Sequence, residues 1–174
     1  PPIKSSAASD VYKRQIQAAA ERMVNANSFL FLGRHVGYPV ALEGALKLKE
    51  IAYTFTEGFA AGELKHGPIA LVDEGEPVVF IVPPQRGRNV LHAKVISGIE
   101  EVKARGAYII AVAEQGDPDV ERYADVVFWR PACPTLMSPL VDVVPLQLFA
   151  MDMAKLKGYD VDKPRNLAKS VTVE

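Results

Sequence analysis

Four short apolar runs constrain the fold of this chain more than any other feature of its sequence. They occupy residues 28–32, 78–82, 107–112 and 125–129. Runs that are apolar at nearly every position are typical of strands buried on both faces of a parallel sheet. Segments with helical spacing of apolar residues lie beside them, at about 15–25, 38–53, 87–105 and 139–157. This order predicts a flavodoxin-like α/β unit: a parallel sheet of four or five strands with helices on both faces.

Composition excludes several classes of protein. The chain has 174 residues, enough for one domain with a sizeable core, and 49 % of them are hydrophobic. Its net charge of -1 gives no electrostatic reason to expect binding to nucleic acid or to an anionic membrane. We read no apolar run as long enough to cross a bilayer, and no secretory signal at the start. We therefore expect a cytoplasmic protein. The single cysteine, Cys133, cannot form an internal disulfide and is interpreted as a loop thiol, with no metal site around it.

The chain divides into three segments. Residues 1–14 begin with two prolines and continue with serine and alanine. We expect them to form a loose leader that need not be native, with the first helix beginning at about Asp10 or Gln15. Residues 15–157 form the domain. Residues 158–174 form a C-terminal tail whose apolar residues can anchor it to the domain.

The helix expected between Tyr38 and Tyr53 carries a polar stripe. Glu43, Lys47, Glu50 and Thr54 follow one another at steps of four, three and four residues, which places them on one side of the helix. An ordinary solvated face gives the same pattern, because Glu and Lys four residues apart form common surface pairs. Alternatively, two carboxylates beside an amine can accept and donate protons next to a bound substrate.

The loops after the first apolar run and after a short extended run at residues 54–57 supply further candidates. Gly33 and Arg34 follow the first apolar run, at the edge of the sheet where ligands bind in such folds. His66 lies in a Lys-His-Gly-Pro loop, and histidine is a common general acid or base in catalysis. His35 lies near enough to the first strand to contact a ligand. His92 falls within a helical segment, where we expect it to be exposed.

Three blocks of sequence point to a family. ALEGALKLKE with AGELKHGP, then VPLQLFA at 144–150, and finally GYDVDKPRNLAKSVTVE at 158–174 keep the order and approximate spacing of one group of proteins. In these blocks the chain resembles the second sugar-isomerase (SIS) domain of the glucosamine-6-phosphate synthases. The resemblance covers nearly everything from about Gln15 onward.

The resemblance implies roles for individual residues. Glu50 would move a proton between C2 and C1 of the sugar, and His66 would open the sugar ring from the neighbouring subunit of a homodimer. Lys47 would handle protons at the substrate oxygens, and Glu43 would hold the substrate. In the tail, Lys169 would form a Schiff base with the open-chain sugar.

Ala168 would lie by resemblance near the ammonia route and the substrate, and Arg165 and Asn166 would pin the tail. The implied reaction converts fructose 6-phosphate and glutamine-derived ammonia to glucosamine 6-phosphate, a step of amino sugar biosynthesis towards UDP-N-acetylglucosamine. No metal or organic cofactor is implied.

The resemblance also implies partners. A Ser- and Thr-rich phosphate loop, which many sugar-phosphate domains of this fold carry, is absent after the first apolar run. In the family, that loop belongs to the first SIS domain, and a glutaminase domain generates ammonia. The chain therefore resembles one half of a site. Alternatives are a sugar-phosphate-binding regulatory SIS module, a deglycase acting on fructosamine 6-phosphate, and a dimerisation domain whose site has decayed.

Overall fold

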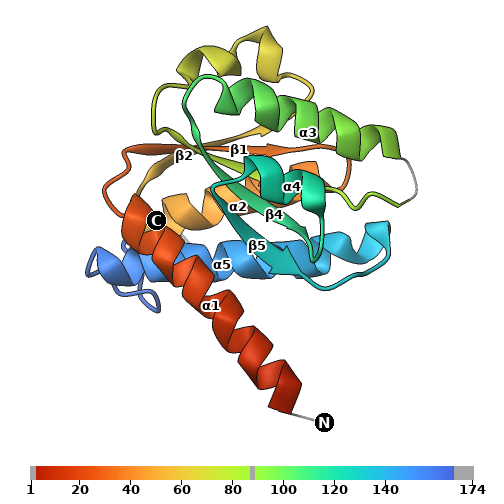
Figure 1. The fold of residues 1–174 in the computed structure, drawn as a ribbon. Coiled ribbons are helices and arrows are strands. Elements are labelled where there is room, and N and C mark those ends of the chain that lie inside the picture. Colours follow the sequence, from red (N-terminus) through yellow and green to blue (C-terminus); the bar gives the residue numbers. More distant parts are fainter. Residues whose placement is uncertain (1–2, 87–88, 167–174) are drawn as a thin grey trace, which may run out of the picture.

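The fold is built on a parallel sheet of five strands. The computed structural model describes residues 3–86 and 89–166. The strands are β1 (Ser28–Gly33), β2 (Phe55–Ala60), β3 (Pro77–Ile81), β4 (Tyr108–Glu114) and β5 (Val126–Arg130). Their order across the sheet is β2-β1-β3-β4-β5, and every neighbouring pair is parallel (Figure 1). This is the flavodoxin-like order, whose direction reverses between β1 and β3. The predicted fold class is confirmed.

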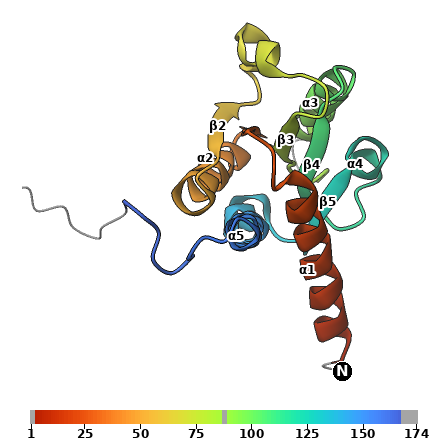
Figure 2. The same cartoon turned by 90° about the vertical axis from the view of Figure 1, so that its left-hand side faces the viewer.

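Helices cover both faces of the sheet (Figure 2). One face packs against α1 (Ile3–Met23), α2 (Gly37–Lys47) and α5 (Ser138–Leu156), and the other against α3 (Asn89–Lys103) and α4 (Pro118–Tyr123). Short helical turns complete the fold: η1 (Leu48–Ala52, a π-helix), and the 3₁₀ turns η2 (Leu64–His66), η3 (Pro68–Leu71) and η4 (Thr135–Met137).

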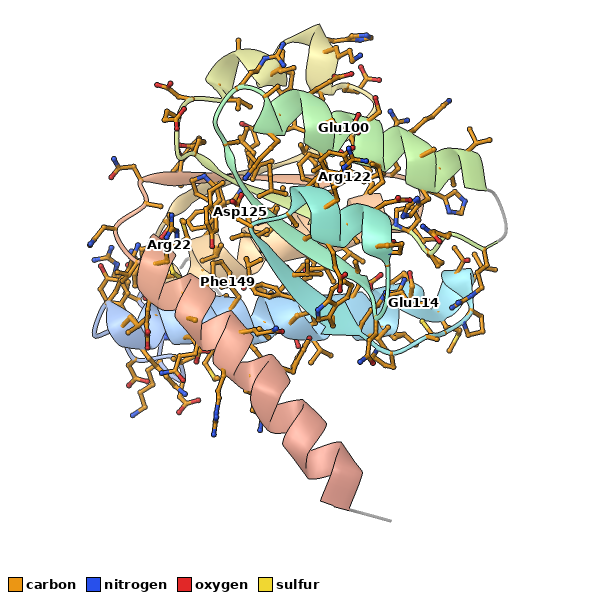
Figure 3. All side chains as sticks on the ribbon, in the orientation of Figure 1. Arg22, Glu100, Glu114, Arg122, Asp125 and Phe149 are labelled. Atoms are coloured by element: carbon orange, nitrogen blue, oxygen red, sulfur yellow. The ribbon has the colours of Figure 1, made fainter. Side chains whose placement is uncertain are left out.

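Alternate residues of β1, β3, β4 and β5 feed two separate cores, as the period of two in a strand requires. In β1, Phe29 and Phe31 face the α5 side, whereas Leu30 and Leu32 face the α3 side. On the α5 side lies Phe149, which is labelled in Figure 3. Its ring packs against those of Phe29 and Phe128, with centroids 5.8 and 5.7 Å apart.

Two elements differ from the predictions. Helix α1 begins at Ile3, so the segment expected to be a loose leader is helical almost from its first residue. Alanine, lysine and arginine all favour a helix, and that segment contains Lys4, Ala7, Ala8, Lys13 and Arg14. Helix α4 was not predicted; it has only six residues, and the Asp117 side chain caps its first turn by accepting from the amides of Asp119 and Val120.

One helical segment is long and apolar enough to span a membrane by length and composition, contrary to the expectation that none would be. It runs from Thr135 to Leu156, and an 18-residue window within it has a mean hydropathy of 1.3. A core helix of a soluble protein passes the same test. Leu146, Phe149 and Met153 of this segment are buried in the core on the α5 side of the sheet.

Candidate active site

The polar stripe of α2 forms a compact ion-pair group. The Lys47 ammonium lies 2.5 Å from a carboxylate oxygen of Glu50 and 3.5 Å from one of Glu43. The side chains of Lys47 and Glu50 are only 28 % and 26 % exposed. The hydrogen bond that the Lys47 ammonium donates to Glu50 raises the pKa of Lys47, with the nearby Glu43 charge adding to the effect and burial opposing it. Lys47 therefore carries a fixed positive charge between two carboxylates at neutral pH.

A π-helical turn places Glu50. Helix α2 passes at Leu48 into η1, which contains Glu50, and the chain then turns through Tyr53 in a left-handed conformation with φ of 51°. Leu48 and Ala52 anchor this turn in the core. Because single π-turns occur frequently at functional positions in helices, this geometry marks Glu50 independently of its charge.

Thr54 does not share the stripe. It lies beyond the π-turn, is buried, and its hydroxyl accepts a hydrogen bond from the Lys157 ammonium at 2.6 Å. Lys157, at the end of α5, also lies 3.4 Å from the carbonyl oxygen of Ala52. Burial lowers the pKa of Lys157. This lysine thus ties the start of the C-terminal tail to the turn that carries Glu50.

Tyr53 holds the next part of the tail. Its ring meets that of Tyr159 edge-on at 4.8 Å, and the Arg165 guanidinium lies over it at 4.1 Å from the ring centroid. The backbone amide of Arg165 donates to the Tyr53 hydroxyl at 2.7 Å. We call Tyr53, Tyr159 and Arg165 the tail clasp. Lys169 and Ala168 lie outside the described residues, but the clasp fixes the chain four residues before Lys169.

His66 lies at the opposite end of the sheet from Glu50. Glu50 comes before β2 and His66 after it, and a strand of six residues spans about 17–20 Å. The two residues also lie towards opposite faces, since Leu48 packs on the α5 side and Leu64 on the α3 side. The His66 imidazole is 71 % exposed, and its Nδ1 lies 3.1 Å from a carboxylate oxygen of Glu63.

Gly33 and Arg34 lie at the carboxyl end of β1, as predicted. A side chain on Gly33 would collide with the carbonyl group of Gly37, so the turn requires glycine there. Within this turn the backbone amide of Gly37 donates a hydrogen bond to the carbonyl oxygen of Arg34, and the amide of Tyr38 donates one to the carbonyl oxygen of His35. These two amides are therefore engaged within the turn and are not free to bind a ligand. His35 is exposed and has a φ of 52°.

Arg34 lines a half-open pocket of about 210 Å³ between η2 and α3, which we call the Arg34 pocket. Its polar lining consists of Arg34, Lys65, Lys94, Ser97 and Glu101. This pocket lies with the His66 loop, at the end of the sheet away from Glu50. The predicted site residues thus form two groups.

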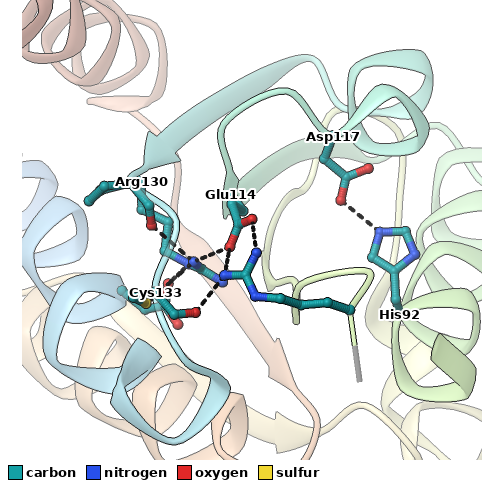
Figure 4. A network of polar contacts seen from close by, with 8 residues as sticks. His92, Glu114, Asp117, Arg130 and Cys133 are labelled. Carbon is teal, nitrogen blue, oxygen red and sulfur yellow. Dashed lines mark hydrogen bonds and ion pairs between the residues drawn. The ribbon is translucent and has the colours of Figure 1, made fainter. Parts of the chain in front are cut away.

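His92 is buried, not exposed as predicted. Only 4 % of the residue is accessible, and its Nε2 lies 2.7 Å from a carboxylate oxygen of Asp117 (Figure 4). With Asp119, the pair offers three potential metal ligands within 4.8 Å of one another. Hydrogen bonds already account for these groups, because the second Asp117 oxygen caps α4 and Asp119 accepts from Gln85. The pair joins α3 to α4.

A buried arginine organises the carboxyl ends of β4 and β5 (Figure 4). Arg130 forms ion pairs with Asp142 at 2.5 Å and Glu114 at 3.1 Å, and Arg86 also contacts Glu114. Burial raises the pKa of Asp142 to about 6, although the charge of Arg130 opposes this shift.

Sequence reasoning missed Tyr53, Tyr159 and Lys157. The predicted helices 38–53 and 139–157 end at Tyr53 and Lys157, and the sequence pattern gives neither residue a role. Their contacts join segments more than a hundred residues apart, and no local pattern signals such pairs.

Comparison with known proteins places these features in a family. Residues 22–157 match the model of the SIS domain family. Over 173 residues, the chain is 63 % identical to the glutamine–fructose-6-phosphate aminotransferase (isomerizing) of Corynebacterium diphtheriae. The match covers 99 % of this chain but 28 % of that protein, so the chain spans about a quarter of the relative's length.

Solved structures agree. The C-terminal domain of the glucosamine-fructose-6-phosphate aminotransferase of Francisella tularensis superposes with a TM-score of 0.77 at 38 % identity, over 87 % of this chain and 42 % of that one. The glucosamine-6-phosphate deaminase of Thermotoga maritima gives a TM-score of 0.68 at 26 % identity, over 93 % and 46 %.

Proposed function

Since this chain belongs to the SIS domain family, we propose that it is the C-terminal isomerase domain of a glutamine–fructose-6-phosphate aminotransferase. Its reaction would convert fructose 6-phosphate and ammonia to glucosamine 6-phosphate. The observation that carries the proposal is the group of Glu43, Lys47 and Glu50 at the root of the clasped tail. Relatives that are about 60 % identical to this chain are named glutamine–fructose-6-phosphate aminotransferases (isomerizing).

The proposed chemistry begins at Lys169. Its amine adds to the C2 carbonyl of the open-chain sugar, and loss of water forms an imine. Ammonia then adds to C2 and the lysine amine leaves, which gives the C2 imine of ammonia. Glu50 takes a proton from C1 while the imine nitrogen gains one, which forms an enaminol. Glu50 then returns its proton to C2 as the C1 hydroxyl loses its proton, which leaves an aldehyde at C1 and an amine at C2. A carboxylate held on a rigid π-turn suits transfer between two adjacent carbons.

Lys47 would serve as a fixed positive charge. Because its pKa is raised by Glu50, it holds its proton at neutral pH. We infer that it stabilises negative charge at a substrate oxygen during enolisation, more than it shuttles protons. Glu43, on the outer side of Lys47, would hold Lys47 and the substrate in place.

His66 would act in trans. A strand length of about 17–20 Å separates it from Glu50 of the same chain, which is far beyond hydrogen-bond reach. If both groups act on one sugar, the histidine must come from a second copy of the chain. This supports a homodimer in which each His66 completes the site of its partner.

The proposal includes further partners. The chain covers about a quarter of its relatives' length and has no Ser- and Thr-rich phosphate loop after β1. We therefore propose that a first SIS domain supplies the phosphate loop and that a glutaminase domain supplies ammonia. Exposed Leu42 and Leu46, beside the stripe on α2, are suited to contact such a neighbouring domain. We place the reaction in the cytoplasm, in amino sugar biosynthesis towards UDP-N-acetylglucosamine, without a metal or organic cofactor.

Borohydride trapping tests the proposal. The chain, alone and mixed with a separately produced first SIS domain, is treated with fructose 6-phosphate and borohydride, and its peptides are mapped by mass. The expected result is an adduct on Lys169 in the mixture only. An adduct in the chain alone would overturn the need for a first SIS domain. An assembled mixture without label on Lys169 would overturn the catalytic proposal.

A further inference from the structure

The Arg34 pocket has unused hydrogen-bond donors. Within the part of the chain that the structure describes, Arg34 Nε is buried without a hydrogen-bond partner. A second guanidinium nitrogen reaches the Ala61 carbonyl oxygen only at 3.5 Å, the limit of a hydrogen bond. A guanidinium carries five N–H donors, and leaving a buried donor unpaired costs free energy. Among the described residues the guanidinium makes one long hydrogen bond, so most of its donors are free to bind an acceptor in the pocket that Arg34 lines.

The charge of the lining favours an anion. Arg34, Lys65 and Lys94 are cations, and Glu101 is the one carboxylate among the lining residues. Glu101 is already paired with Lys65 at 2.6 Å. The charges of Arg34 and Lys94 thus remain without a counter-charge in the pocket lining.

The pocket wall is built from regular structure. Lys94, Ser97 and Glu101 lie on one side of α3, at steps of three and four residues. Across the pocket, the guanidinium lies against Gly62, where an added Cβ would be 3.3 Å from one of its nitrogens. The Arg34 fork is therefore backed by main chain on one side. Such a planar fork matches the oxygens of a phosphate group.

The fold predicts a ligand in the same place. In a sheet of this order, ligands bind beyond the carboxyl ends of the strands, where the order reverses beside β1. Arg34 follows β1 directly. The pocket volume of about 210 Å³ is below the range of roughly 300–1,000 Å³ typical of sites for drug-sized ligands. A single phosphate group fits this size better than a nucleotide does.

We propose that the Arg34 pocket binds a phosphate group, either free or as the monoester of a small molecule, at a site separate from the Glu50 stripe. Arg34 and Lys94 bind the phosphate oxygens and Ser97 donates a hydrogen bond. Because Lys65 precedes His66, an anion that competes with Glu101 for Lys65 also changes how the His66 loop is held. This assignment does not depend on the proposed enzymatic activity.

Titration followed by two-dimensional NMR of the ¹⁵N-labelled chain tests the site. Inorganic phosphate is added at constant ionic strength, with chloride as the balancing anion. We expect saturable shifts centred on the amides of Gly62, Lys65, Ser97 and Gly98. Arg34→Gln should weaken phosphate binding about tenfold or more, since hydrogen bonds to charged groups contribute about 1.5–3 kcal/mol. Lys94→Gln, an exposed change that leaves the core intact, should weaken it several-fold.

Lys13→Gln is the matched control, because it removes the same charge from exposed α1 and should leave phosphate affinity unchanged. Glucosamine 6-phosphate, in a parallel titration, identifies the source. Tighter binding than inorganic phosphate indicates a monoester ligand, whereas equal or weaker binding indicates free phosphate. Shifts that do not saturate, shifts spread equally over distant lysines, or unchanged affinity in both Arg34→Gln and Lys94→Gln would overturn the proposal.

Discussion

The two ends of the sheet differ in how completely their polar groups are paired. At the amino end, Lys47 is paired with Glu50, Lys157 with Thr54, and Tyr53 with Arg165. At the carboxyl end of β1, Arg34 has a buried nitrogen without a partner among the described residues. The amino end is thus a preorganised group suited to chemistry, whereas the Arg34 pocket is a set of donors suited to binding. Glu50 and His66 are close in sequence, but they lie at opposite ends of the sheet because β2 runs between them.

The largest expected effect comes from Glu50→Gln in a full-length protein that carries this domain. Loss of a general base typically costs about 10²–10⁴-fold in rate. We expect glucosamine 6-phosphate formation to fall by that factor, while the amide still accepts from Lys47 and the fold is kept. A coupled assay of product formation measures it. Glu121→Gln is the control, because this carboxylate is exposed on α4 and its loss should leave the rate unchanged. A loss of rate below tenfold in Glu50→Gln would show that Glu50 is not the base.

The tail clasp gives the next largest effect. Tyr53→Ala removes an aromatic contact, a cation–π contact and a hydrogen bond, each worth about 0.5–1.5 kcal/mol. Hydrogen exchange at the Arg165 amide should accelerate about tenfold or more. Tyr53→Phe keeps the two ring contacts and should show a smaller acceleration. Equal exchange in Tyr53→Ala and the parent chain would show that the tail is held by other contacts.

The carboxyl end of β5 gives a pH-dependent effect. Burial raises the pKa of Asp142 to about 6 from an ordinary value of 3.8, so the folded chain holds this proton more tightly than the unfolded chain. Its contribution to stability is full below about pH 4 and is lost as the pH rises through 6. At 1.36 kcal/mol per pKa unit, the loss is about 2–3 kcal/mol.

The measurement is the free energy of unfolding in urea at several pH values. In Asp142→Asn, the fall in the free energy of unfolding that Asp142 causes between pH 4 and 6 should vanish. The pH dependence that comes from Glu114 and other carboxylates should persist in both proteins. Parallel stability curves for the two proteins would contradict the assigned shift of Asp142.

The smallest effect is expected from Glu43→Gln on stability. Its partly exposed pair with Lys47 at 3.5 Å should contribute a few tenths of a kcal/mol, as helical pairs four residues apart do. Urea unfolding should therefore barely change, with Glu100→Gln on α3 as a surface control. A loss above about 1 kcal/mol would mean that the stripe exists for stability instead of chemistry.

Much of the fold follows from sequence, because buried parallel strands leave continuous apolar runs. Strand β2 has no continuous apolar run, because it is an edge strand with exposed Phe55 and Glu57. The sequence therefore indicates only a short extended run there. The stripe was also predictable, since a helix fixes the relative positions of Glu43, Lys47 and Glu50.

Other features depend on contacts between residues far apart in the chain, so the local sequence pattern could not predict them. His92 is buried because Asp117, 25 residues later, provides its partner. The left-handed Tyr53 and the π-turn before it depend on the packing of α2 against α5 and β2. The separation of His66 from Glu50 became visible only once β2 was placed between them.

Mixing two inactive variants tests the central claim that Glu50 and His66 of different copies form one site. Glu50→Gln and His66→Asn versions of a full-length protein are unfolded and refolded together, and mass spectrometry verifies mixed dimers. In a symmetric dimer, each mixed pair has one intact site, so about a quarter of the parent activity should return. Mixed dimers that remain inactive would contradict the account and place both residues' function within one chain.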